Sequence, residues 1–376
     1  MKFEQIVWTR GAGWKILVSE KSLQPQLVFV FGSNEALRDS AAPDYFKARF
    51  PGAHLFGGTS AYEINQNGFA ENSVVATAAE FDNPELQFAK APLTQASSEE
   101  AARVLAAQFS GRENISHIIV LCDGLHINGA RFAGELGRQL PGIAVTGGMT
   151  ASADVAESTV ELLDGELLER HAIAVAFGKN VKTGYGSGGG WDAFGVYRKI
   201  TRSEENCVYE IDGEPALALY RKYLGGQPDR LEYSVQYFPL LLKETAESGG
   251  RVRSVIRIDE SKNALIFAAD MPEGWHVRLM KYNPGRLAEG AAGAAGKGVA
   301  GINMNRNFLA LLVSCVGRQV VMKKRIEDEI DAAVRVLGGN QIMFGFYSRG
   351  EICPLERAGG PVYHNQTMTI TTLSDE

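Results

Sequence analysis

The sequence has few cysteines and no long apolar run, and both absences restrict the class of protein. None of the cysteines forms a Cys-x-x-Cys pair, so neither a zinc site nor a disulfide framework is indicated. We expect all four to be reduced thiols that pack in the interior: Cys122, Cys207, Cys315 and Cys353. The longest apolar runs, 174–177 and 308–313, are far shorter than the ~20 residues that span a bilayer. Residues 1–10 lack the apolar core of a signal peptide, so we expect a cytoplasmic protein without membrane insertion.

Basic tracts and enzyme motifs are also missing. The net charge is −6 and no run of Lys or Arg stands out, which argues against nucleic-acid binding. Segment 184–189 matches Gly-x-Gly-x-x-Gly, but the residues after it do not open a helix, as a dinucleotide-binding loop requires. Segment 291–297 lacks both the first Gly and the final Ser or Thr of a Walker A loop. Because a Gly-x-Ser-x-Gly elbow is absent too, we predict a protein that is not an enzyme.

Glycine, in contrast, is abundant. The chain has 42 glycines in 376 residues, about 11% against a usual ~7%. This excess implies many tight turns or close approaches between backbones. The hydrophobic fraction of 45% and the charged fraction of 22% are ordinary for a globular protein, and the length predicts two or three domains.

The N-terminal half contains an internal repeat with an offset of 90 residues. Three signals recur in the same order, namely a buried-type apolar run, a Pro-Gly turn and a Gly-Gly segment. These pairs are 28–30 with 118–120, 51–52 with 141–142, and 57–61 with 147–151. A repeat of this kind fixes the architecture of a fold. It predicts two strand–helix–strand units that each end in a Gly-Gly turn, at about 27–90 and 117–185.

Strands that alternate with helical segments predict an α/β fold of the mixed α+β kind, with mixed sheets flanked by helices. We place a domain boundary near Asp212, which gives domains at 1–211 and 212–376. In the second domain, 319–337 has the pattern of one amphipathic helix that ends at a Gly-Gly pair. Segment 285–301 is rich in Gly and Ala and predicts a weak helix or a flexible segment.

The C-terminal segment 345–370 is poorly explained by core filling. Its first half, Gly-Phe-Tyr-Ser-Arg-Gly-Glu-Ile-Cys-Pro, is an aromatic strand end that breaks at Gly350. Its second half places His364, Asn365 and Gln366 in a row. Strand ends and loops on a rigid scaffold often carry function, so we interpret this tail as one wall of a recognition pocket.

His276 and Arg278 alternate with apolar residues and are expected on the same face of a strand. A neutral imidazole beside an arginine could ligate haem iron while the arginine pairs with a propionate. The alternative is a histidine that simply faces solvent. For His364 we expect hydrogen bonding rather than metal ligation, because two amide side chains follow it.

Several of these motifs resemble the FIST family of sensory proteins. Segment 345–354 together with 364–369 resembles the hallmark of the FIST C-terminal domain, as do 271–280 and 313–318. The Gly-Gly segments at 57–60 and 147–148 look like the FIST N-terminal domain. The tail is the more specific part of this resemblance, which covers nearly the whole chain.

The resemblance implies a signal-transduction sensor that binds a small ligand such as an amino acid. Because the two regions of resemblance use up the chain, it also implies a free-standing sensor that regulates a separate partner, such as a histidine kinase in a two-component system. Some free-standing members are haem proteins that sense nitric oxide, and this is the leading specific form. It implies haem as cofactor, with His276 as the metal ligand and Arg278 beside the cofactor. The open alternatives are a haem-free metabolite sensor, an enzyme on a small metabolite, and a scaffold without ligand.

For the ligand pocket we expect contributions from the Gly-Gly segment and from the tail. Glycines let backbone N–H groups approach a carboxylate, and the neighbouring hydroxyls add donors. The predicted ligand-binding residues are Gly57, Gly58, Thr59, Ser60, Arg349, Glu351, His364 and Asn365. The alternative is that the Gly-Gly segments serve strand geometry alone.

Overall fold

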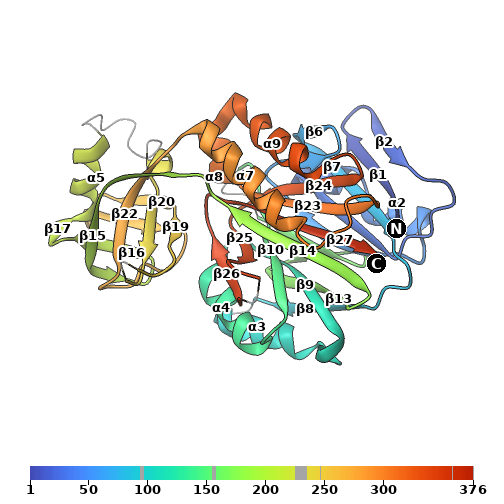
Figure 1. Cartoon of the computed structure of the whole chain (residues 1–376), viewed down its shortest axis with the longest axis horizontal. Helices are drawn as coiled ribbons and strands as arrows, with labels where there is room; N and C mark the ends of the chain where they lie inside the picture. Colours follow the sequence, from blue (N-terminus) through green and yellow to red (C-terminus); the bar gives the residue numbers. More distant parts are fainter. Residues whose placement is uncertain (94–96, 155–157, 225–234, 246, 358, 376) are drawn as a thin grey trace.

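The computed structural model describes residues 1–93, 97–154, 158–224, 235–245, 247–357 and 359–375. Figure 1 shows a larger body and a smaller body, the latter on the left. The larger body contains three sheets built from both ends of the chain, and the smaller body contains one sheet built from the strands between residues 192 and 281. Mixed sheets flanked by helices confirm the predicted fold class.

The first two sheets of the larger body differ in how much of each half of the chain they contain. The first has the strand order β12-β11-β4-β3-β7-β1-β2. Its strands are β1 (Lys2–Thr9), β2 (Gly13–Ser19), β3 (Leu27–Gly32), β4 (His54–Thr59), β7 (Ser73–Glu80), β11 (Val160–Leu163) and β12 (Glu166–Glu169). The second has the order β26-β25-β10-β9-β13-β8. Its strands are β8 (Leu86–Pro92), β9 (Ile115–Cys122), β10 (Ala144–Met149), β13 (His171–Gly178), β25 (Glu351–Pro354) and β26 (Pro361–His364).

The third sheet combines strands from the N-terminal and C-terminal parts of the chain, in the order β14-β27-β23-β24-β5-β6. Its strands are β5 (Glu63–Asn65), β6 (Gly68–Ala70), β14 (Val181–Gly188), β23 (Phe308–Cys315), β24 (Gln341–Ser348) and β27 (Met368–Asp375). Each of the three sheets is centred on one parallel pair, β3 with β4, β9 with β10, and β23 with β24. An antiparallel strand, β7, β13 or β27, lies beside each pair.

The larger body is therefore a threefold repeat rather than the twofold repeat that the sequence indicated. In each of the three parallel pairs, a glycine of the second strand lies opposite an apolar residue at the equivalent position of the first strand. These pairs are Val30–Gly57, Val120–Gly147 and Leu312–Gly345. The second glycine of the first two units is replaced by Phe346 in the third, so the third unit lacks the Gly-Gly signal.

After its parallel pair, each unit sends a β-hairpin to a neighbouring sheet. The hairpin β5–β6 leaves the first unit and pairs with β24 of the third. The hairpin β11–β12 leaves the second unit and pairs with β4 of the first. The hairpin β25–β26 leaves the third unit and pairs with β10 of the second. The three units are thus linked in a closed cycle.

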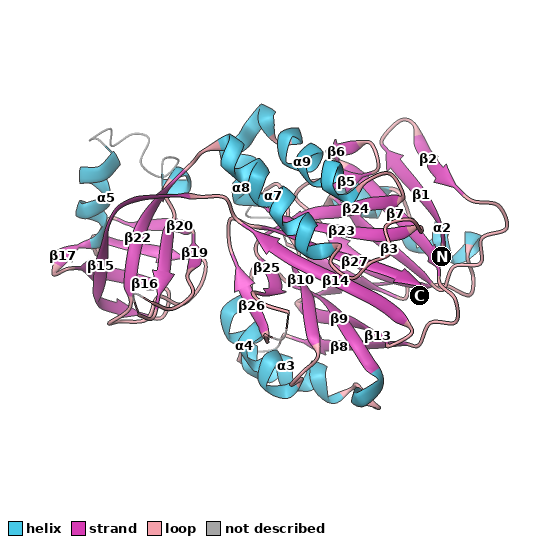
Figure 2. Cartoon of the chain, in the orientation of Figure 1, coloured by secondary structure: helices cyan, strands magenta, loops and turns pink. Residues whose placement is uncertain are grey.

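The inner faces of the three sheets meet in one apolar core, which draws Phe29, Ile119 and Leu311 from the three first strands. Within it the rings of Phe31 and Phe346 stack with their centroids 4.5 Å apart. Helices cover the outer faces (Figure 2). They are α1 (Asn34–Asp39) and α2 (Ala42–Arg49) on the first sheet, α3 (Ser98–Ala107) and α4 (Gly129–Gln139) on the second, and α7 (Pro284–Gly298), α8 (Val316–Met322) and α9 (Glu327–Leu337) on the third.

The predicted Gly-Gly turns are wrong in detail, because both glycine pairs lie inside strands. Gly57 and Gly58 belong to β4, and the second pair belongs to β10. A Cβ atom on Gly57 would stand 1.7 Å from the carbonyl oxygen of Val30 on the neighbouring strand, and one on Gly345 would stand 1.8 Å from that of Leu312. The glycines therefore permit a close approach of two parallel strands.

The predicted single helix over 319–337 is also wrong. Helix α8 ends at Met322, and a 3₁₀ turn over Lys323–Arg325 separates it from α9. Lys323 has a φ of +51°, in the left-handed region that a continuing helix cannot contain. Segment 284–298 forms the helix α7, so of the two alternatives for the Gly/Ala-rich segment 285–301 the helix is confirmed.

A fully buried ion pair holds the third unit together. Arg318 of α8 donates from Nε to Glu329 of α9 over 2.6 Å, and its other nitrogens donate to the carbonyls of Gly189 and Leu287. The second oxygen of Glu329 accepts from the hydroxyls of Ser314 and Tyr347. Because the side chains of Arg318 and Glu329 are both fully buried, loss of either charge would leave its partner uncompensated.

The smaller body is a sheet of eight strands in which one helix covers the apolar face. The order is β19-β18-β22-β15-β16-β21-β20, and β17 pairs with β16. The elements are β15 (Asp192–Glu204), β16 (Cys207–Ile211), β17 (Glu214–Pro215), α5 (Ala216–Leu224), β18 (Leu240–Lys243), β19 (Arg251–Arg253), β20 (Val255–Asp259), β21 (Ala264–Phe267) and β22 (His276–Lys281). Asp212 lies at the turn between β16 and β17, and the domain boundary placed there stays a prediction.

The close approach of the parallel strands gives a testable consequence. We expect Gly345→Ala to destabilise the protein by about 3 kcal/mol or more, because the new methyl group would overlap a backbone carbonyl that cannot move independently of its sheet. Chemical denaturation of the full chain measures this difference. The matched control is Gly296→Ala in α7, where a Cβ atom meets nothing within 4 Å and a gain of up to about 1 kcal/mol is expected. Equal effects of the two substitutions would contradict the close-approach argument.

Candidate functional site

Each exchanged hairpin carries a buried glutamate that reaches back to its own unit. We call these three residues, Glu63, Glu161 and Glu351, the carboxylate clasps. Each glutamate pairs with a residue of the neighbouring sheet that its hairpin joins. Glu63 lies opposite Phe346, Glu161 lies opposite Gly58, and Glu351 lies opposite Gly148. All three side chains are fully buried, so each carboxylate must find its hydrogen bonds within the protein.

The hydrogen bonds of the carboxylate clasps repeat with the threefold pattern. Glu63 accepts from the Ser60 hydroxyl over 2.5 Å and from the N–H and hydroxyl of Ser73. Glu161 accepts from Thr150 Oγ1 over 2.8 Å and from the N–H of His171. In every unit the hydroxyl lies at the end of the second parallel strand or directly after it, and the N–H belongs to a residue at the start of the antiparallel strand or directly before it.

Glu351 completes the set in the third unit. It accepts from Ser348 Oγ over 2.8 Å, from Thr367 Oγ1 over 2.6 Å and from the Thr367 N–H. Burial raises its pKa to about 8, and burial raises the pKa of Glu63 to about 7. Desolvation raises the pKa of these carboxyls more than the hydroxyl donors lower it, so both stay protonated at pH values well above the usual pKa of a glutamate.

Three backbone hydrogen bonds close a ring where the units meet. Ala61 N–H donates to Tyr347 O over 3.1 Å, and Ala151 N–H donates to Thr59 O over 3.1 Å. Arg349 N–H donates to Met149 O over 3.3 Å. The Gly-Gly strands and the tail, which are far apart in the sequence, therefore meet at one rim, as the predicted pocket requires.

The predicted donors of the Gly-Gly segment are already engaged within the protein. The Ser60 hydroxyl binds its clasp, and Thr59 Oγ1 accepts from the N–H of Val160 over 3.1 Å. The space beside Gly58 is already occupied, since a Cβ atom there would stand 2.9 Å from a methyl group of Thr150. These contacts favour the alternative in which Gly57, Gly58, Thr59 and Ser60 serve strand geometry.

Arg349 breaks the threefold pattern, because it occupies the position of Ala61 and Ala151 in the other units. Its side chain lies against Gly124, and the charge of Asp123 acts on its guanidinium. Asp123 accepts from the backbone N–H and the ring Nδ1 of His126, each within 3.0 Å. Arg349 therefore extends from the rim toward Asp123, while its main-chain oxygen accepts from the Tyr363 hydroxyl over 3.1 Å.

His364 is a wall residue rather than a free donor. Its Nε2 lies 2.8 Å from the carbonyl oxygen of Cys353, and the side chain is buried. Burial lowers the pKa of His364 to about 4, so the ring is neutral at physiological pH.

Cys122, Cys315 and Cys353 are buried free thiols and Cys207 is partly buried, in agreement with the packing role expected for these residues.

The tail meets the smaller body at a set of buried polar side chains that we call the junction cluster. Strand β19 of the smaller body packs beside β26 of the larger body. Arg253 Nη1 donates to the carbonyl oxygen of Tyr363 over 3.2 Å, and its guanidinium carbon lies 5.8 Å from the centre of the Tyr363 ring. The junction cluster consists of Arg253, Tyr363 and Asn365 together with the neighbouring Gln366, whose amide lies against Gly317 of α8; all four are at most 5% exposed.

The junction cluster contains polar atoms without hydrogen-bond partners. Both amide atoms of Asn365, both amide atoms of Gln366 and Nε of Arg253 are buried and unpaired. The Asn365 amide lies near enough to the Tyr363 hydroxyl to influence its titration, yet makes no hydrogen bond of normal geometry. A buried unpaired polar group costs about 1–3 kcal/mol. Five such atoms within four residues therefore mark a place where stability is lost unless another molecule supplies partners.

Two features describe the backbone at Gln366. Gln366 has a φ of +59°, a conformation that non-glycine residues seldom adopt. Its backbone oxygen accepts from Trp191 Nε1 over 2.9 Å and from Arg318 Nη1 over 3.3 Å. Because two donors hold the Gln366 carbonyl, the backbone stays in this conformation, and local strain of this kind is concentrated at functional sites.

His276 and Arg278 lie on β22 of the smaller body, remote from the tail. His276 stands opposite Lys199 and Lys243, and its Nδ1 is buried without a partner. Arg278 donates to the carbonyl oxygen of Gly195 over 2.9 Å. Among the described residues no three His, Cys, Asp or Glu side chains converge as metal ligands.

Haem requires a large apolar cavity besides an axial ligand. The apolar cavity in this sheet is lined by Val277 and Leu279, which alternate with His276 and Arg278 and face the other side of β22. It measures about 20 Å³, far below the several hundred Å³ of a ligand pocket. The polar neighbours of His276 could pair with propionates, but these residues do not fit the macrocycle itself.

The sequence pointed to Asn365 and Gln366 but missed Arg253 and Tyr363. Arg253 lies in a short strand that also contains Arg251, and nothing in its neighbourhood in the sequence shows that it is buried. The unpaired state of these side chains depends on contacts between segments that are more than 100 residues apart, as the Arg253–Tyr363 hydrogen bond illustrates. Only the structure could therefore reveal the junction cluster.

Comparison with known proteins gives two family matches and two distant similarities. A model of the FIST N domain matches residues 26–214, and a model of the FIST C domain matches residues 216–354. An uncharacterized protein of Methanocaldococcus jannaschii is 25% identical over 214 residues, which are 52% of this chain and 40% of that protein. The chain thus matches less than half the length of this relative.

Among solved structures, cyanuric acid hydrolase from A. caulinodans is similar with a TM-score of 0.33 and 9% identity, over 94% of this chain and 90% of that one. Within the described part of the chain, no helix is long and apolar enough to cross a membrane.

The raised pKa of Glu351 predicts a pH-dependent stability. The folded protein retains this proton up to about pH 8, whereas the unfolded chain loses it near pH 4.5, so the contribution of Glu351 to stability falls as the pH rises between these values. Glu351→Gln stays neutral throughout and lacks this loss. We expect the melting temperature of the variant, relative to the parent, to be at least about 2 °C higher at pH 8 than at pH 5.

Thermal melts of both proteins at pH 5 and pH 8 measure this difference. Glu356→Gln, which changes an exposed glutamate near the same hairpin, is the matched control for the loss of one carboxylate. A difference between Glu351→Gln and the parent that is the same at both pH values would contradict the argument.

Proposed function

Because the chain belongs to the FIST family, with its N and C domains in order, we propose that it is a sensor that binds a small carboxylate-bearing ligand, such as an amino acid, in the junction cluster. Family membership supports a signal-transduction sensor of small ligands. The one observation that carries the proposed site is the set of buried, unpaired polar atoms on Arg253, Asn365 and Gln366.

The chemistry of the junction cluster matches a ligand with both charge and hydrogen-bonding groups. Arg253 is a buried cation without an ion pair to an acidic side chain in the described residues, and burial lowers its pKa to about 10. A carboxylate would restore the favourable environment of this charge and accept from the free Nε. The amides of Asn365 and Gln366 offer donors and acceptors at once, which suits the amino and polar groups of an amino acid.

The position of the cluster suggests how binding produces a signal. The two bodies are joined by two chain crossings, between β14 and β15 and between β22 and α7 (Figure 2). Across their interface, Asp270 accepts from Asn128 and Arg131, and Arg131 also pairs with Glu205. Because the unpaired atoms are buried and Arg253 lies where β19 packs beside β26, in this proposal the ligand enters when these two strands separate.

This geometry corresponds to a hinge between two bodies that close around a ligand. Arg253 contributes from the smaller body and Asn365 from the larger one, so a bound molecule links them directly. Its differential affinity for the closed arrangement would set the balance between states. In this proposal the smaller body carries the response to a separate signalling partner such as a histidine kinase.

Haem-dependent nitric oxide sensing is a second candidate, which the unpaired Nδ1 of His276 favours and the small size of the apolar cavity on the other face of β22 opposes. When bound, haem would supply an iron that takes nitric oxide as a ligand. An absorbance spectrum after addition of haem decides between the two forms. A stoichiometric Soret band that is lost in His276→Ala would favour the haem form, and a protein that stays colourless would remove it.

A thermal-shift screen of the common amino acids and small carboxylic acids tests the junction cluster. We expect at least one compound to raise the melting temperature, because ligand binding stabilises the folded state by mass action. Asn365→Leu keeps the size of the side chain but removes the amide. We expect this variant to be as stable as the parent, or about 1 kcal/mol more stable, and to lose the ligand response.

The matched control is Asn305→Leu, which changes an exposed asparagine and should leave the ligand response intact. Arg253→Met is a second test of the same site, since it removes the charge while keeping the length of the side chain. A ligand response that survives both Asn365→Leu and Arg253→Met would place the binding site elsewhere. An Asn365→Leu variant that is strongly destabilised would show that the amide has a structural role.

A further inference from the structure

The smaller body has an irregular strand that presents apolar side chains to solvent. In β15, Phe194 stands opposite Leu279 and Arg198 stands opposite Val277 of β22. Residues 195–197 therefore lie opposite the single residue Arg278. This excess of residues in one strand is a β-bulge. Gly195 takes a φ of +73° there, the left-handed conformation that a bulge of this kind requires. Bulges re-aim side chains, and this one directs its residues away from the sheet.

The side chains around the bulge are unusually exposed for their type. Phe194 is 40% exposed, Val196 is 67% exposed and Tyr197 is 37% exposed. Among the described residues, eight large hydrophobic side chains are this exposed, and three of them lie within these four positions. Scattered apolar residues on a surface need no explanation, whereas a concentration of them marks an interaction site.

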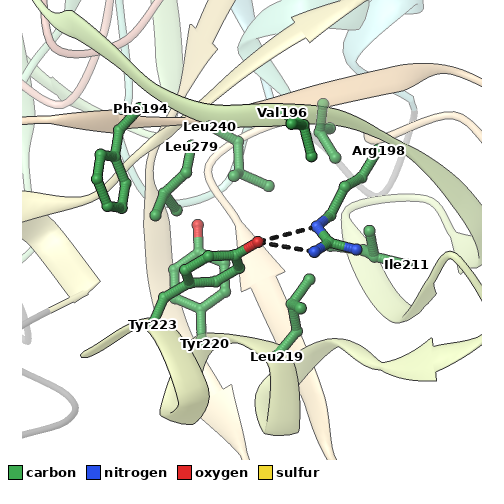
Figure 3. Close-up of a pocket in the computed structure, with 10 residues that line it drawn as sticks. Phe194, Val196, Arg198, Ile211, Leu219, Tyr220, Tyr223, Leu240 and Leu279 are labelled. Atoms are coloured by element: carbon green, nitrogen blue, oxygen red, sulfur yellow. Dashed lines mark hydrogen bonds between the residues drawn. The ribbon is translucent and has the colours of Figure 1, made fainter. Parts of the chain in front are cut away.

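Phe194 and Val196 flank a small apolar notch between β15 and α5 (Figure 3). Its space of about 20 Å³ is lined by Leu219, Tyr223 and Leu279 among other residues. This volume is too small for a metabolite and suits the tip of one apolar side chain.

The polar end of the notch is already satisfied. Arg198 Nε and Nη2 donate to the Tyr223 hydroxyl over 3.1 and 2.8 Å, and Nη1 donates to Asp212 over 2.9 Å (Figure 3). The guanidinium therefore has little capacity left for a small polar ligand. The notch is accordingly a contact surface for another apolar group rather than a second ligand pocket.

Cations surround the exposed rings. The Arg278 guanidinium carbon lies 5.3 Å from the centre of the Tyr197 ring and Lys243 Nζ lies 5.6 Å from it, while Lys281 Nζ lies 6.0 Å from the centre of the Phe194 ring. The chain as a whole carries a net charge of −6, so this local excess of positive charge runs against its general character. The acidic neighbours Asp192 and Asp212 are paired with arginines.

From these observations we propose that the bulge of β15 docks an acidic protein segment, with one apolar side chain of that segment in the notch. Val196 and Phe194 supply the apolar contact, and Lys281 and Arg278 attract the acidic residues on either side. Complementary charge of this kind guides association and fixes the register of a partner. The surface is separate from the junction cluster, so the inference goes beyond the proposed ligand site.

Fluorescence anisotropy with the full chain and synthetic ten-residue peptides tests this surface. One labelled peptide is rich in Glu with a central Leu, a second has Ser in place of this Leu, and a third is rich in Lys with the central Leu. We expect the first to bind, and the other two to bind at least tenfold more weakly. Binding of the first should weaken as the salt concentration rises, because exposed charges are screened.

Variants of the chain locate the binding. Val196→Asp and Lys281→Glu should each weaken binding of the Glu-rich peptide at least fivefold. The matched control is Ile256→Asp on β20, because Ile256 is 56% exposed on the same body and its change should leave the affinity unaltered. Circular dichroism and melting temperatures show whether each variant is folded.

Three outcomes would overturn the proposal. Equal binding of the Leu and Ser peptides would show that the notch takes no part, and equal binding of the Lys-rich peptide would show that charge takes no part. If the parent self-associates in sedimentation and Val196→Asp abolishes this, the bulge is an interface between copies of this chain. Each result is independent of whether an amino acid binds at the junction cluster.

Discussion

The larger body depends on one constraint, the exchange of hairpins between three strand–helix–strand units. Each unit gives its hairpin to a neighbouring sheet, so no unit can complete a sheet alone. The carboxylate clasps tie every hairpin back to its own unit, through a hydroxyl at Ser60, Thr150 or Ser348. Buried carboxyls are costly unless their hydrogen bonds are satisfied, and the repeated donors meet this need. The third unit is further fixed by the buried pair of Arg318 and Glu329.

This constraint explains why the tail, and not the Gly-Gly segment, carries the candidate site. In all three units the donors near the rim are used to hold hairpins, and this leaves little for a ligand. The third hairpin differs because its second strand, β26, packs beside β19 of the smaller body, where Tyr363 meets Arg253. There the protein leaves Asn365 and Gln366 unpaired. The fold is therefore symmetric where it is structural and departs from symmetry where we place the function.

The sequence predicted the mixed α/β class and the first two units, because these depend on local patterns, while the role of the tail as a site stays a prediction. It missed the third unit because Phe346 replaces the second glycine and the offset of 90 residues is lost. It placed Gly57 and Gly58 in turns, since a glycine pair alone cannot distinguish a turn from a close approach of strands. Arg253 could not be predicted as a site residue, because its burial depends on Tyr363, 110 residues away. His276 followed from a strand pattern that gives no information about cavity size.

The central claim is that a small ligand binds between the two bodies, in contact with both Arg253 and Asn365. The most direct measurement is a crystal structure of the protein with the compound that gives the largest thermal stabilisation. The account predicts ligand density in the junction cluster, with a carboxylate beside the Arg253 guanidinium and hydrogen bonds to the amides of Asn365 and Gln366. Density at another place, with the junction cluster unchanged and its amides still unpaired, would contradict it.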